Sequence, residues 1–152
     1  MEFVRSPGVA EVICLRLDEG EDVQQSVEAL AAKLDIRAGA VLSGVATLKR
    51  ACLHMVTTTG YPPKEAFLNL TGPIEVASIS GIIADRQPHL HATITDSSGA
   101  AFGGHLEPGC IVLYLAEVVV VRFEGPALTR VKHPRTGIKQ LKEKPPPDTI
   151  LV

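Results

Sequence analysis

The stretch from Pro88 to Val121, PHLHATITDSSGAAFGGHLEPGCIVLYLAEVVVV, decides the predicted fold. Residues 88–96 are typical of a strand that ends in an Asp–Ser–Ser–Gly turn, and residues 109–123 of a longer strand rich in valine. Along the chain, most strand-like segments are separated by too few residues for a crossover helix, which favours antiparallel pairing over a parallel βαβ arrangement.

The rest of the chain extends this pattern. Apolar segments punctuated by Gly, Pro, Asn and Ser predict further strands near residues 9–17, 40–47, 50–58, 65–71 and 74–84. Residues 21–35 differ because their apolar side chains recur at helical spacing, which predicts an amphipathic helix. A chain of 152 residues favours one domain. We therefore expect a single-domain α+β fold, a mainly antiparallel sheet with one main amphipathic helix packed on it.

The most apolar segment of the chain indicates how the interior is covered. Residues 111–121 are apolar on both alternating sides, and such a strand is usually covered on both faces. One helix cannot supply that cover alone, so an oligomer interface is expected to contribute.

Cys14, Cys52 and Cys110 are far apart and lie among apolar residues, which favours buried reduced thiols over a disulfide or a metal site.

Three of the five histidines lie in the first 18 residues of the opening stretch. His89 and His91 form an H-x-H pair, and alternate residues of a strand point to the same face. His105 follows a glycine-rich turn that can bring it back beside them. Three imidazoles suit zinc or another divalent transition metal, with a fourth position left for water, substrate or a carboxylate. The alternative is polar filling of a surface or core.

Three acidic residues are candidates for a role beside these histidines: Asp96, Glu107 and Glu117. Glu107 and Glu117 are the candidates for a general base if the site is catalytic. Glu117 interrupts the most apolar strand, so it needs a partner there, either at the histidines or in Arg122 or backbone amides. His54 and His133 are interpreted as structural or solvated. No nucleotide-binding motif is present, so no nucleotide cofactor is expected.

Charge and hydropathy limit the partners. Residues 1–129 carry 9 Lys and Arg against 15 Asp and Glu, whereas residues 130–152 carry 6 against 2. The basic end is interpreted as a solvated tail, although it could touch nucleic acid or an acidic partner. No apolar run approaches the ~20 residues that span a bilayer, so we expect no membrane partner and a cytoplasmic protein.

Six short motifs occur in an order that identifies a family. They are Gly20–Asp22, Ser43–Ala46, Phe67–Gly72, His89–His91, Gly103–Leu106 and Ala116–Val118. With these motifs the sequence resembles the plants-and-prokaryotes conserved (PPC) domain. We expect residues 1–137 to form this domain and residues 138–152, with three consecutive prolines, to form an extended Pro-rich tail.

The resemblance implies a homotrimer with a metal site, zinc first, at the histidines matching His89, His91 and His105. Prokaryotic relatives are often described as DNA-binding, but this chain lacks the Arg-Gly-Arg-Pro core of the AT-hook that plant relatives use, and its body is acidic. One hypothesis is a metal-binding trimeric protein with a DNA-associated or regulatory binding role. The other is a metal-dependent, hydrolase-like enzyme acting on a small molecule. Whether the chain is an enzyme stays open on the sequence.

Overall fold

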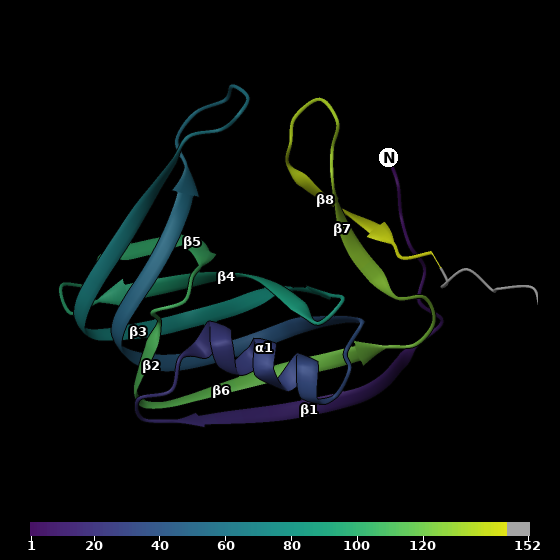
Figure 1. Ribbon diagram of the computed structural model, residues 1–152. Coiled ribbons are helices and arrows are strands. Elements are labelled where there is room, and N and C mark those ends of the chain that lie inside the picture. Colours follow the sequence, from purple (N-terminus) through teal and green to yellow (C-terminus); the bar gives the residue numbers. More distant parts are fainter. Residues whose placement is uncertain (146–152) are drawn as a thin grey trace, which may run out of the picture.

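The computed structural model describes residues 1–145, which form one helix, one large sheet and one small sheet (Figure 1). In chain order the elements are β1 (Val9–Asp18), α1 (Val23–Lys33), β2 (Ala38–Val56), β3 (Glu65–Ala84), β4 (Gln87–Asp96), β5 (Ala101–Leu106), β6 (Ile111–Phe123), β7 (Leu128–Lys132) and β8 (Lys139–Glu143). The large sheet has the order β1-β6-β2-β3-β4-β5, and every neighbouring pair is antiparallel. The predicted α+β class, with one helix on a mainly antiparallel sheet, is confirmed.

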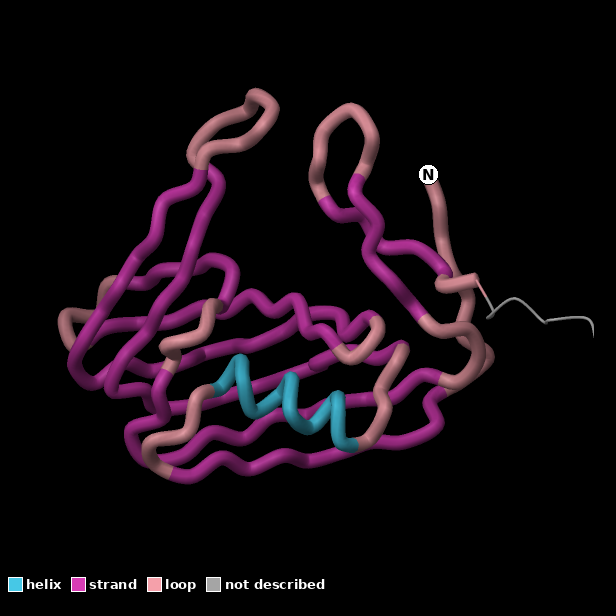
Figure 2. The backbone as a smooth tube through the Cα atoms, viewed as in Figure 1, coloured by secondary structure: helices cyan, strands magenta, loops and turns pink. Residues whose placement is uncertain are grey.

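The large sheet curls back on itself at one end. β5 pairs with β4 and also with the far half of β2, so strands β2 to β5 enclose one end of the core (Figure 2). β5 was not predicted, because Gly103 and Gly104 read as turn residues. Because β5 pairs with both strands, this closure brings residues of β2 and β4 close to one another.

Two strands are longer than predicted. β2 replaces two expected strands, and β3 replaces another two. The Gly72–Pro73 pair, interpreted from the sequence as a turn, lies within β3. Leu48 pairs with Ile74 and Arg50 pairs with Thr71, so Gly72 and Pro73 together lie opposite the single residue Lys49. Two residues opposite one are a β-bulge, which absorbs a proline without ending the strand.

Helix α1 covers one face of the large sheet (Figure 1). The Asp22 side chain accepts a hydrogen bond from the Gln25 backbone N–H at 3.0 Å and caps the first turn. Val23, Val27 and Ala31, spaced by four residues, are fully buried against the sheet. The helix predicted for residues 21–35 is confirmed, with its ends two residues inside the expected bounds.

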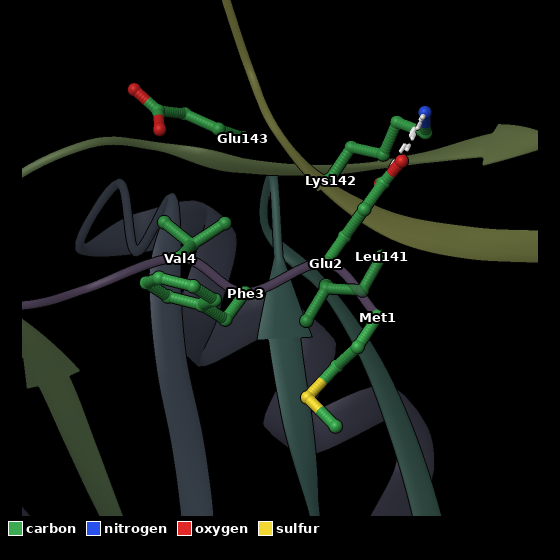
Figure 3. Close-up of a pocket in the computed structure, with 7 residues that line it drawn as sticks. All are labelled: Met1, Glu2, Phe3, Val4, Leu141, Lys142 and Glu143. Atoms are coloured by element: carbon green, nitrogen blue, oxygen red, sulfur yellow. Dashed lines mark hydrogen bonds and ion pairs between the residues drawn. The ribbon is translucent and has the colours of Figure 1, made fainter.

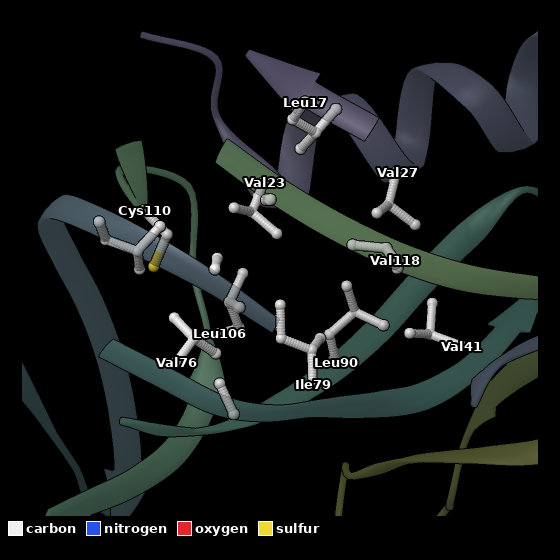
Figure 4. Close-up of a cluster of buried hydrophobic side chains, with 14 of the residues drawn as sticks. Leu17, Val23, Val27, Val41, Val76, Ile79, Leu90, Leu106, Cys110 and Val118 are labelled. Carbon is white, nitrogen blue, oxygen red and sulfur yellow. The ribbon is translucent and has the colours of Figure 1, made fainter. Parts of the chain in front are cut away.

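The core lies between α1 and the curled sheet (Figure 4). Ile79, Leu90 and Leu106 are among its largest fully buried side chains, and they come from three adjacent strands. Burying a leucine contributes about 1.5–3 kcal/mol, so these residues fix the strands that carry the histidines. Leu90 is the inward residue between His89 and His91, so both histidines face away from the core.

The other face of β1, β6 and β2 is uncovered in the single chain. Val12, Val45 and Leu115 are 62%, 45% and 45% exposed. Glu117 lies on this face as well, so the expectation that it is buried is wrong. Its register partners are Arg16 and Val45, whereas Arg122, one of the alternative partners considered for it, pairs with Glu11.

The cysteines divide between the two faces of the sheet. Cys110 is fully buried, and burial raises the pKa of its thiol to about 11, as expected for an inert thiol. Cys52 is half-buried and its backbone N–H donates to the Cys110 sulfur. Cys14 is exposed on the uncovered face, so its predicted burial is wrong for the single chain. All three are free thiols.

Residues 128–143 form a hairpin, so the extended tail expected from residue 138 does not begin there. Lys139–Glu143 pairs with β7, so the expected boundary between residues 137 and 138 falls inside the hairpin loop. Leu128 is buried against Ala38 and Ala84. Lys144 pairs with Asp85 at 2.6 Å, and Lys142 pairs with Glu2 at 3.4 Å beside the N-terminal segment (Figure 3). Residues 146–152 of the predicted tail lie outside the described residues.

Among residues 1–145, no helix is long and apolar enough to cross a membrane.

Candidate metal centre

Four histidines meet where the sheet closes. His89 and His91 come from β4, His105 from β5 and His54 from β2. His105 is the register partner of both His91 and His54, which puts the three in one row across β4, β5 and β2. Antiparallel register partners have Cβ atoms about 4.5–5.5 Å apart, so their imidazoles are within reach of one another.

Donor atoms of His89, His91 and His105 all lie within 4.8 Å of one another. The Nε2 atoms of His89 and His91 are 3.3 Å apart. The ring centroid of His105 is 4.7 Å from that of His89 and 5.4 Å from that of His91, with the rings nearly perpendicular. The structure thus brings together the three histidines that the sequence singled out.

A second donor group shares His105. It consists of His54, His105 and Glu107, also within 4.8 Å of one another. His54 Nδ1 is 2.6 Å from Glu107 Oε1, with both side chains largely buried, whereas His105 Nε2 is 3.7 Å from the same oxygen. Glu107 follows β5 directly, and its backbone N–H donates to the Cys52 carbonyl of β2. That bond holds the Glu107 backbone beside β2, the strand that carries His54.

Burial and nearby charges keep the shared histidine neutral. Burial is the largest cause, and together with the positive charges of neighbouring histidines, and against the opposing effect of Glu107, it lowers the pKa of His105 to about 4. Burial also lowers the pKa of His89, and the charge of Arg130 adds to this effect. A neutral imidazole has the free lone pair that a metal ion requires, so both side chains are ready to act as ligands at neutral pH.

The histidines open into a cleft of about 480 Å³. It is lined by His54, Met55, Val56, Pro63, Glu65, His89, His91, Gly104, His105 and Ile138. The β2–β3 hairpin forms one wall, and Ile138 of the β7–β8 loop contributes from the other side. A cleft of this size accommodates a small molecule beside the imidazoles.

A glycine allows the site to close. A Cβ atom at Gly104 would lie 2.6 Å from the carbonyl oxygen of His54, closer than real Cβ atoms approach. Only glycine therefore lets β5 lie this close to β2 and place His105 beside His54.

The other predicted acidic candidates lie elsewhere. Asp96 accepts hydrogen bonds from the backbone N–H groups of Ser98 and Ala100, so it stabilises the β4–β5 turn. Glu117 lies on the uncovered face of β6. Glu107 is the one acidic candidate at the site. Sequence reasoning missed His54, because its only signal is the β2–β5 pairing, which joins residues about 50 positions apart.

Comparison with known proteins identifies the family. Residues 4–124 match the Plants and Prokaryotes Conserved (PCC) domain, the family that the sequence motifs indicated as PPC. Among curated proteins, the chain is 34% identical over 139 residues to the bifunctional protein GlmU of Synechococcus sp. strain JA-2-3B'a(2-13). That match covers 91% of this chain but 21% of the relative, so the chain spans about a fifth of the length of the curated relatives it matches.

Solved structures share the fold. A hypothetical protein from Salmonella enterica is 26% identical with a TM-score of 0.79, covering 94% of this chain and 98% of its own. A protein from Archaeoglobus fulgidus, described as metal-containing, is 24% identical with a TM-score of 0.81, covering 94% and 100%. A protein from Bacteroides thetaiotaomicron, to which a DNA-binding role has been ascribed, is 18% identical with a TM-score of 0.75, covering 91% and 96%. From the match over residues 4–124, this chain belongs to the PCC domain family.

Proposed function

We propose that His89, His91 and His105 bind one divalent transition metal, with zinc as the first choice. The distance between the His89 and His91 Nε2 atoms carries the proposal. Two nitrogen ligands of a tetrahedral zinc ion, each about 2.05 Å from it, lie ~3.3 Å apart, and these two atoms are 3.3 Å apart. The solved relative from Archaeoglobus fulgidus, described as metal-containing, supports the same assignment.

The proposed site faces a cleft rather than a closed interior, which favours a small-molecule ligand. A zinc ion held by three imidazoles supplies Lewis acidity at its fourth position. The Glu107 carboxylate accepts a hydrogen bond from the N–H at His54 Nδ1, and in the tautomer that this bond selects Nε2 of His54 is the free acceptor. His54 can therefore take a proton from a ligand group in the cleft, with Glu107 stabilising the imidazolium. We infer a metal-dependent enzyme with hydrolase-like chemistry.

A DNA-associated role is the second candidate. It is supported by the DNA-binding role ascribed to the relative from Bacteroides thetaiotaomicron and by the basic residues of the β7–β8 hairpin. Fluorescence anisotropy with a labelled duplex, at low and at high salt, tests it. Binding that weakens steeply with salt and is lost when the hairpin lysines are replaced supports this role, and no binding at low salt excludes it.

We also propose the homotrimer that the family resemblance implies. The uncovered face of β1, β6 and β2 supports an interface there. Light scattering during size exclusion should give three times the chain mass of 16.2 kDa. Val45→Arg should dissociate the assembly, whereas Val131→Arg, at a similarly exposed valine of β7, should not. A monomeric wild-type protein would refute this assembly.

Metal content tests the centre directly. Plasma mass spectrometry on untagged protein should find about one zinc per chain, and His91→Ala should lose it. His133→Ala is the matched control, because His133 lies outside both donor groups. No metal in the wild-type protein after incubation with zinc would overturn the proposal. Equal loss in both variants would point to a folding defect and would count against it.

A further inference from the structure

The β7–β8 hairpin lies outside the residues that match the family, yet it reaches the histidine site. The match ends at residue 124, and β7 begins at Leu128. Arg130 of β7 donates to the carbonyl oxygens of Gln87 at 2.9 Å and Ile82 at 2.8 Å. Ile82 is the register partner of His89. These two bonds fix the guanidinium at the end of β4, beside the first histidine.

Arg130 carries a charge that nothing in residues 1–145 neutralises. Its side chain is half-buried, and burial lowers its pKa. No acidic side chain among those residues forms an ion pair with it, and its partners are neutral carbonyls. Two of its five N–H donors are engaged, which leaves three for a ligand. A partly buried cation without a counter-ion is unfavourable, so the site is suited to an anion.

A hollow joins Arg130 to the metal centre. Its volume is about 320 Å³, and it is lined by Gly81, Ile82, His89, Arg130, Lys139 and Leu141. His89 also lines the larger cleft, so the two hollows meet at that side chain. No carboxylate lines the smaller hollow. Lys139 is exposed and forms no ion pair within the described part of the chain.

We propose that Arg130 and Lys139 form an anion subsite for the ligand of the histidine centre, which is a small molecule bearing a carboxylate or phosphate group. The guanidinium binds the oxyanion through paired charge-assisted hydrogen bonds, and the lysine adds a second positive charge. The anionic group then anchors the ligand while its body extends past His89 into the cleft. The C-terminal hairpin thus determines which ligands this member of the family accepts. The inference rests on the proposed small-molecule function.

Anion titrations test the subsite. Inorganic phosphate and acetate are titrated separately, at constant ionic strength, and binding is followed by amide chemical shifts. Arg130→Gln should weaken binding of the preferred anion about tenfold, the factor expected from one lost charge-assisted hydrogen bond. Lys139→Gln should weaken it several-fold. The anion that binds more tightly identifies the ligand as a phosphate or a carboxylate compound.

Lys132→Gln is the matched control, because Lys132 is the register partner of Lys139 but does not line the hollow. Equal weakening in the control would show non-specific charge attraction and would overturn the subsite. Arg130 also holds the β3–β4 turn through its bonds to Ile82 and Gln87, so Arg130→Gln could prevent folding. If that variant is misfolded, the test rests on Lys139→Gln. Unchanged anion affinity in Lys139→Gln would then refute the proposal.

The same titration on protein stripped of metal separates the two proposals. Anion binding that survives stripping and depends on Lys139 supports the subsite, whether or not the wild-type protein holds zinc. Anion binding that disappears with the metal but is unaffected by Arg130→Gln and Lys139→Gln would place the anion on the metal alone and refute the subsite. Metal content measured on each sample reports on the histidine centre independently.

Discussion

Replacing the donors one at a time tests which group would hold the proposed ion, since two groups share His105. His54 Nδ1 and Glu107 Oε1 are 2.6 Å apart. Two ligands at that separation would subtend only about 80° at an ion with bonds of about 2.05 Å, far from the tetrahedral angle. The pair is therefore interpreted as a hydrogen bond and not as two ligands of one ion, which favours His89 and His91 as the partners of His105 in the proposed site.

This geometry predicts a graded loss of zinc affinity. His89→Gln removes a ligand and should raise the zinc Kd more than about a hundredfold, beyond the ~10–100-fold that outer-shell substitutions cost. Glu107→Gln keeps the shape but removes a negative charge near His105, so it should fall within that range. His54→Gln keeps a polar side chain at this position and leaves the carboxylate in place. Its effect should stay below about tenfold, or 1.4 kcal/mol.

Competition with a chromophoric zinc chelator near neutral pH measures these constants. His133→Gln is the control for replacing a histidine outside both groups, and circular dichroism confirms that each variant is folded. A larger loss from His54→Gln or Glu107→Gln than from His89→Gln would place the ion between His54, His105 and Glu107. That order would refute the distance argument.

Three further outcomes follow from packing and charge. Gly104→Ala should lower both the melting temperature and the zinc content, because its Cβ would lie 2.6 Å from a β2 carbonyl oxygen. Gly103→Ala, whose Cβ would have its nearest contact at 3.5 Å, should change neither quantity. Calorimetry and metal analysis measure the two effects. Leu90→Ala should cost about 2–5 kcal/mol in urea unfolding, since Leu90 is fully buried, and a cost below about 1 kcal/mol would contradict its role in fixing β4. The hydrogen bond from Lys144 lowers the pKa of Asp85 in the folded protein below its value in the unfolded chain. The pair therefore stabilises the fold above about pH 4. This contribution is lost as the pH falls through the pKa of Asp85 in the folded protein. Acid unfolding of Lys144→Gln should therefore depend less steeply on pH than that of the wild-type protein, and parallel curves would contradict the assignment.

The features predicted correctly are those that depend on neighbouring residues. The helix follows from apolar residues spaced along residues 21–35, and the common direction of His89 and His91 follows from strand alternation. The placement of His105 also follows, because the β4–β5 turn is short.

The features that were missed depend on distant pairing. His54 reaches the site only because β5 returns to β2, and no local pattern specifies which earlier strand a curled sheet meets. Glu117 was expected to be buried because its neighbours are apolar. Its immediate neighbours Ala116 and Val118 are buried in the core, but strand alternation puts Glu117 on the opposite face with Leu115, and a single chain leaves that face open. The β7–β8 hairpin was hidden because its strands are short and rich in charge.

The charges of that hairpin favour a small anion over duplex DNA. Lys142 is paired with Glu2, Lys144 is paired with Asp85, and Arg130 is bound to backbone carbonyls at the mouth of the hollow. Few basic side chains of residues 130–145 are then left to contact phosphates, and each phosphate contact contributes separately to the affinity for DNA. A single oxyanion needs only two cations, and Arg130 and Lys139 both line the hollow beside His89. The same arginine is thus poorly placed for a DNA backbone and well placed for a ligand of the histidine centre.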